Sequence, residues 1–112
     1  MYTYNAYVTE VYDGDTITVD IDLGFGIKIT NQKIRLFGIN APELKGKTKA
    51  GGIKSRDKLT ELILNKQVKI ETVKDKKEKY GRLLGKIWIE DTMVNDVLLK
   101  EGFAVSYMAD ED

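Results

Sequence analysis

Hydrophobic and polar residues alternate along the first third of the chain, as they do in β-strands. Residues 6–12 are rich in β-branched and aromatic side chains, and residues 16–23 alternate strictly between aliphatic and Thr or Asp side chains. The pair Asp13-Gly14 separates the two segments and predicts a tight hairpin. A glycine-marked turn then leads to a third strand over residues 27–37, with a bend expected at Thr30-Asn31.

A period near 3.6 residues replaces the alternation in the middle of the chain and predicts the main helix. The helix is expected to start near Ala50 and to stop at Asn65, and Gly51-Gly52 is expected to weaken its first turn. The aliphatic residues near this period are Ile53, Leu59, Leu62 and Ile63.

The rest of the chain predicts two more strands and a short helix. Strand patterns cover residues 66–73 and 82–90, on either side of a polar loop, and residues 94–102 predict the helix. Five strands with a helix between the third and fourth indicate a mainly β fold, a five-stranded OB-type Greek-key barrel. A generic α+β sheet also fits this order.

The chain has 112 residues, a length that suits one domain over residues 1–112. We expect an ordered core over about residues 8–107 and a frayed acidic tail over residues 109–112. No apolar run has the roughly 20 residues of a membrane span. The N-terminus has no signal-peptide pattern, so both a cytoplasmic protein and a secreted one whose signal is absent remain open.

The composition limits the chemistry of any site. There is no cysteine and no histidine, which excludes Ser-His and Cys-His nucleophiles and leaves acid–base work to Asp, Glu, Lys or Tyr. The net charge is zero, but residues 44–86 carry 14 basic and 5 acidic residues. A basic middle third suggests a polyanionic partner, and a lysine-rich solvated surface is an equally good interpretation.

Two strand positions are candidates for phosphate and cation chemistry. Asp15 follows the hairpin glycine and is either a turn former or an oxygen ligand for a hard cation. Arg35, between two aliphatic residues, is either a surface arginine or a planar fork aimed at a phosphate.

The single proline marks a second candidate region. Asn40 and Glu43 flank Ala41-Pro42, whose restricted backbone would hold the two side chains in a fixed relation. A polar loop before a helix is the simpler explanation of these residues, and a cation ligand at Asn40 with a general base at Glu43 is the alternative.

A third candidate region precedes the last strand. Lys79, Tyr80 and Arg82 surround Gly81, which is expected to supply a positive-φ turn. Tyr107 is either at the rim of the core or a platform on which a base stacks.

Together these motifs resemble the staphylococcal nuclease family, also called thermonuclease-like domains. The matching segments are VYDGDTITV, IRLFGINAPE, KYGRLLGKIWIE and MVNDVLLKEGFA, which run in the family's order from about Val8 to Tyr107. The resemblance implies an OB barrel and a calcium-dependent nuclease that cuts DNA and RNA. We expect it to favour single-stranded or denatured substrates and to act as a monomer.

The resemblance also implies roles for single residues. Asp15 and the backbone carbonyl of Ala41 match metal ligands, and Glu43 matches the general base. The residues that match phosphate or substrate contacts are Arg35, Arg82, Lys79, Tyr80 and Tyr107. At Asn40 the family's best-studied members carry a second metal-binding Asp, so weaker calcium binding is expected. This departure favours an alternative, a non-catalytic module that binds nucleic acid or protein.

Overall fold

The computed structural model describes residues 2–73, 77 and 79–107. The predicted acidic tail and part of the polar loop over residues 75–81 lie outside these residues. The helical segments are η1 (Gly46–Thr48), α1 (Lys49–Ile63) and α2 (Val94–Lys100). The strands, in chain order, are β1 (Thr3–Asp13), β2 (Thr16–Asp22), β3 (Lys28–Leu36), β4 (Ile39–Asn40), β5 (Gln67–Thr72), β6 (Leu83–Ile89), β7 (Thr92–Met93) and β8 (Val105–Ser106).

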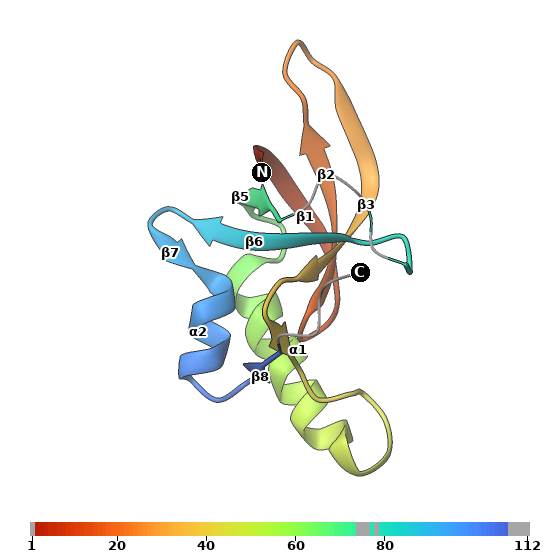
Figure 1. Ribbon diagram of the computed structural model, residues 1–112, viewed down its shortest axis with the longest axis vertical. Helices are drawn as coiled ribbons and strands as arrows, with labels where there is room; N and C mark the ends of the chain where they lie inside the picture. Colours follow the sequence, from red (N-terminus) through yellow and green to blue (C-terminus); the bar gives the residue numbers. More distant parts are fainter. Residues whose placement is uncertain (1, 74–76, 78, 108–112) are drawn as a thin grey trace.

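Five of these strands close into a barrel (Figure 1). β1, β2 and β3 form an antiparallel meander, and β1 also pairs with β5, which pairs with β6. The barrel closes where β3 and β6 run parallel, with Ile34 opposite Leu83 and Leu36 opposite Gly85. The predicted OB-type barrel with a helix between its third and fourth strands is therefore confirmed.

The core lies inside the barrel and under the two helices. Aliphatic residues from the inward faces of the strands meet α1 through Leu59 and Ile63, and α2 through Leu98. The strict alternation of β2 accounts for its three buried aliphatic residues, because period 2 sends alternate side chains to one face. Leu23 was expected to share that face, but it lies beyond the end of β2 and is exposed.

The predicted bend and the predicted end of the main helix are confirmed, because asparagine tolerates the positive φ angles that the backbone adopts there. Asn31 and Asn65 adopt positive φ angles of 56° and 59°, at the expected bend and at the expected helix stop. The helix begins at Lys49 after a short 3-10 turn that the sequence pattern did not predict. No helix in the described part of the chain is long and apolar enough to cross a bilayer.

Candidate active site

The β1–β2 hairpin places Asp15 at one edge of the barrel. Asp13 stabilises the turn, because its Oδ1 accepts a hydrogen bond of 3.0 Å from the Asp15 amide. Gly14 packs closely against Ala41 and Ser55. A Cβ at Gly14 would lie 2.6 Å from the Cβ of Ala41 and 2.7 Å from that of Ser55. Asp13 is thus a turn former, as expected, and Asp15 is left for other contacts.

The Asp15 carboxylate is buried and bridges two segments. Asp15 as a residue is only 7% exposed to solvent. Oδ2 accepts a hydrogen bond of 2.9 Å from the Ala41 amide, and Oδ1 accepts one of 3.2 Å from the Thr16 hydroxyl. The Asp15 carboxylate therefore links the Ala41-Pro42 segment to the β1–β2 hairpin.

The Arg35 guanidinium lies beside this carboxylate and is held by backbone carbonyls. Nη1 lies 3.5 Å from Asp15 Oδ2, and it donates hydrogen bonds of 3.0 Å to Leu36 O and 2.9 Å to Ile39 O. Nη2 donates one of 3.3 Å to Asn40 Oδ1. Arg35 is buried, so it is not the solvated surface arginine of the alternative interpretation.

An aromatic ring covers the same guanidinium. The Arg35 Cζ atom lies 5.5 Å from the centroid of the Tyr107 ring, within the range of a cation–π contact. β8 carries Tyr107 to this place, because β8 pairs with β4 and the Tyr107 amide donates to Gly38 O. Tyr107 thus joins residues that are far from it in the sequence.

Arg82 reaches the site from the start of β6. Its Nη1 donates a hydrogen bond of 3.3 Å to Thr16 Oγ1, the hydroxyl that also donates to Asp15. The Tyr80 ring lies 5.4 Å from the Arg82 Cζ atom and 5.2 Å from the Lys79 ammonium nitrogen. Gly81 has a φ angle of 81°, as expected, so the chain turns between these residues.

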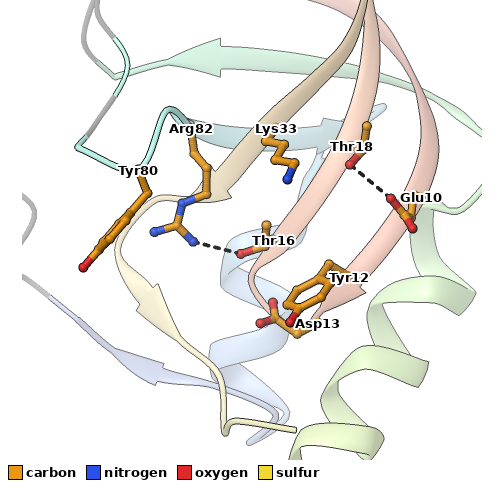
Figure 2. A pocket seen from close by; sticks show the side chains of 8 residues that line it. All are labelled: Glu10, Tyr12, Asp13, Thr16, Thr18, Lys33, Tyr80 and Arg82. Atoms are coloured by element: carbon orange, nitrogen blue, oxygen red, sulfur yellow. Dashed lines mark hydrogen bonds between the residues drawn. The ribbon is translucent and has the colours of Figure 1, made fainter.

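Glu43 lies outside the network of contacts that joins the two arginines. It is exposed and lines a cavity of about 260 Å³, whose other walls are Tyr12, Asp13, Leu44 and Lys45. A second cavity, of about 410 Å³, contains Arg82 and Tyr80 and also has Tyr12 and Asp13 in its wall (Figure 2). The Glu43 cavity and the Arg82 cavity therefore share Tyr12 and Asp13.

The structure thus brings the predicted residues together to different degrees. Asp15, Arg35, Asn40, Ala41 and Tyr107 are linked by direct contacts, and Arg82 joins them through Thr16. Tyr80 contacts Arg82, Lys79 contacts Tyr80, and Glu43 lines the neighbouring cavity. Thr16 was not predicted as a site residue, although its place on the polar face of β2, next to Asp15, was a signal for it.

Asp13 also has an electrostatic property that its expected role in the turn did not predict. Burial, and then the charge of Asp15, raise the pKa of Asp13 from its ordinary 3.8 to about 6. Two carboxylates only two residues apart were the signal in the sequence. The Asp13–Asp15 turn therefore concentrates negative charge at the edge of the site.

The oxygen donors at this edge suit a hard cation. Asp15 offers a carboxylate, Asn40 an amide oxygen and Ala41 a backbone carbonyl, and calcium prefers such ligands. Within the described ranges, no three Asp, Glu, His or Cys residues are grouped to hold a metal ion. The donor set therefore fits a cation in kind, with few charges to hold it tightly.

Comparison with known proteins supplies the class of protein. A family model described as "Staphylococcal nuclease homologue" matches residues 33–112. Thermonucleases from Staphylococcus hyicus and Staphylococcus intermedius are each 36% identical to the chain, over 87% of it and 56% of their own length. Endonuclease YncB from Bacillus subtilis is 32% identical, over 93% of the chain and 49% of its own length. The chain therefore belongs to the staphylococcal nuclease family, and it spans about half the length of these relatives.

Proposed function

We propose that the protein is a metal-dependent endonuclease. It would hydrolyse phosphodiester bonds of DNA and RNA with little sequence specificity, act as a monomer, favour denatured substrates and use Ca²⁺. One observation carries the proposal: Asp15, Arg35 and Arg82 meet in one connected network at the edge of the barrel. One guanidinium beside a buried carboxylate, and a second joined to it through the Thr16 hydroxyl, suit a phosphodiester held next to a cation.

The contacts of Arg35 support its role as a phosphate clamp. A guanidinium has five N–H donors, and Leu36 O, Ile39 O and Asn40 Oδ1 use three of them. Among the described residues, the Nε–H and one Nη2–H of Arg35 have no acceptor. A fork of two fixed donors binds two phosphate oxygens at little cost in reorganisation.

Arg82 and Glu43 would complete the reaction. Arg82 would donate to the same phosphate and stabilise the charge that develops on its oxygens as water attacks. Glu43, from the neighbouring cavity, would orient the water and accept its proton. A cation held by Asp15, Asn40 and the Ala41 carbonyl would polarise the phosphoryl oxygen and acidify water.

A non-catalytic binding module is the second candidate function. It is favoured by Asn40, which supplies an oxygen without the charge of a carboxylate, and by the sparse acidic groups of the described site. Such a module would bind nucleic acid through the same arginines and leave it intact.

Incubation of the purified protein with denatured DNA separates the two functions. The nuclease should cleave the DNA when Ca²⁺ is added and stop when a chelator is added. Arg35→Lys, which keeps the charge and removes the fork, should lower the rate by roughly 10²-fold or more, with circular dichroism to confirm that it folds. Salt-sensitive binding without cleavage would establish the binding module instead.

A further inference from the structure

A second row of polar side chains lies beside the site on the same face of three strands. The strand register aligns Asp13, Thr16 and Arg35 across β1, β2 and β3. Glu10, Thr18 and Lys33 are aligned in the same way. On β2 and β3 the two rows are two residues apart, so their side chains project to the same side.

The cavity of about 410 Å³ joins this second row to the site (Figure 2). Arg82 and Tyr80 line it near the candidate active site, and Lys33 and Thr18 line it along the second row. Tyr12 and Asp13 form the wall that it shares with the Glu43 cavity. One continuous surface thus connects Arg82 with Lys33.

Lys33 and Tyr12 have the properties of ligand-binding groups. Lys33 is exposed, and its ammonium group has no hydrogen-bond or ion-pair partner in the part of the chain that the structure describes. Two residues along a strand span about 7 Å, which places Lys33 about one nucleotide step of an extended strand from Arg35. Tyr12 is 65% exposed at the cavity wall, so one face of its ring is open to a flat ligand.

We propose that this cavity is a subsite for the nucleotide next to the scissile phosphate, an inference that rests on the proposed function. The Lys33 ammonium binds the neighbouring phosphate, and the Tyr12 ring stacks on the base that this nucleotide carries. The substrate class is then a single strand of at least two linked nucleotides. Stacking requires an unpaired base, which gives the preference for denatured substrates a structural basis.

Glu10 determines where the phosphate lies in the cavity. Its carboxylate accepts a hydrogen bond of 3.4 Å from Thr18 and repels a phosphate placed nearby. The phosphate is therefore held toward Lys33 and Arg82, and Glu10→Gln should tighten binding.

Oligonucleotide binding tests the subsite. Fluorescence anisotropy would measure the affinity of labelled oligothymidylates for the wild type, for Lys33→Gln and for Lys69→Gln, a matched change of an exposed strand lysine outside the cavity. Lys33→Gln should bind several-fold more weakly than Lys69→Gln, with a salt slope smaller by about 0.7. Tyr12→Ala should bind about tenfold more weakly, and Tyr12→Phe should bind like the wild type, because stacking needs only the ring.

Oligothymidylates with one neutral methylphosphonate linkage identify the phosphate that Lys33 contacts. Neutralising this linkage should weaken binding to the wild type and have no further effect on Lys33→Gln. If the wild type cleaves DNA but Lys33→Gln and Lys69→Gln behave alike, the subsite is overturned and the proposed function stands. Binding without cleavage that still depends on Lys33 and Tyr12 supports the subsite and removes the nuclease function. A wild type that neither binds nor cleaves removes both.

Discussion

Asn40 is the residue at which the proposed ligand set has a neutral side chain where the family resemblance leads us to expect a carboxylate. Its amide oxygen accepts a hydrogen bond from Arg35 and lies next to Ala41, whose amide donates to Asp15. Asn40 thus contacts the guanidinium directly and is one residue from the carboxylate. Its neutral side chain leaves Asp15 as the only carboxylate among the proposed ligands.

Asn40→Asp should strengthen calcium binding. A second carboxylate raises the charge of the ligand set, so the dissociation constant for Ca²⁺ should fall by about tenfold or more. Isothermal titration calorimetry measures this constant without reference to activity. Asn5→Asp, an exposed position on β1, controls for the added charge. An unchanged dissociation constant would mean that Asn40 is not a ligand.

Asp13→Asn should change how stability depends on pH. The pKa of Asp13 is about 6 when folded and near 3.8 when unfolded. Between these values the folded state retains a proton that the unfolded chain has lost, so the free energy of unfolding falls as pH rises through about 4 to 6. The asparagine variant does not titrate, so it does not lose stability over this pH range. Its side-chain oxygen can still accept the hydrogen bond from the Asp15 amide. Urea denaturation of both proteins with a chelator, from pH 4 to 7, should show their difference growing in favour of the variant. A constant difference would contradict the raised pKa.

The sequence predicted the individual site residues better than their contacts. Asp15, Arg35 and Arg82 stood out because charged residues interrupt strand patterns or follow turns. Residue types alone do not reveal that Arg35 donates three hydrogen bonds within the protein. Two of the acceptors are backbone carbonyls, of Leu36 and Ile39, and the third is Asn40 Oδ1. Thr16 was missed because threonines are common in strands, and only its position next to Asp15 on the polar face of β2 distinguishes it.

At the scale of elements, the start of α1 is shaped by a close approach to the Pro42–Glu43 backbone. A Cβ on Gly52 would lie 2.5 Å from Glu43 O, whereas a Cβ on Gly51 would meet only Pro42 side-chain atoms at 3.4 Å or more. Both glycines were expected only to weaken the helix, but their structural roles differ, because only Gly52 needs to lack a side chain. Gly52 allows the helix to pack against the segment that carries the proposed base.

Gly52→Ala and Gly51→Ala form a matched pair that tests this difference. Gly52→Ala should lower the free energy of unfolding by about 1–3 kcal/mol, because the Glu43 backbone must shift. Gly51→Ala should raise it by about 0.5–1 kcal/mol through better helix propensity. Chemical denaturation gives both values, and cleavage should also slow only in the Gly52 variant. Equal effects would show that the close approach is unimportant.

Much of the fold was predictable because its elements have clear periods. The alternation of β2 and the Asp-Gly hairpin agree with the structure. Leu59 and Ile63 of the predicted α1 stripe are buried, whereas Ile53 is not, and Gly52 and Ser55 continue the buried face in its place. The short strands β4 and β8 were not predicted, since two-residue strands form only when tertiary contacts align their backbones. Phe37, Trp88 and Phe103 are only partly buried, although large aromatic side chains are usually found in a core.

Charge matters at the scale of the whole molecule. Residues 44–86 have a net charge of +9, and they include Arg82 and Lys79 beside the site. A polyanion should therefore be drawn to the edge of the barrel where Arg82 lies. Affinity for single-stranded DNA, measured by anisotropy at increasing salt, should fall with a slope of about −0.7 for each phosphate contacted. Affinity that is independent of salt would contradict an electrostatic site.

The most direct test of the account is the rate of cleavage of denatured DNA as Ca²⁺ is titrated, for the wild type, Glu43→Gln and the control Glu61→Gln. Both glutamates are exposed, so neither change should disturb the fold. The wild-type and Glu61→Gln rates should rise and saturate with Ca²⁺, and the Glu43→Gln rate should be roughly 10²-fold lower with DNA affinity unchanged. Cleavage that is absent at every calcium concentration, or equally fast in both variants, would contradict it.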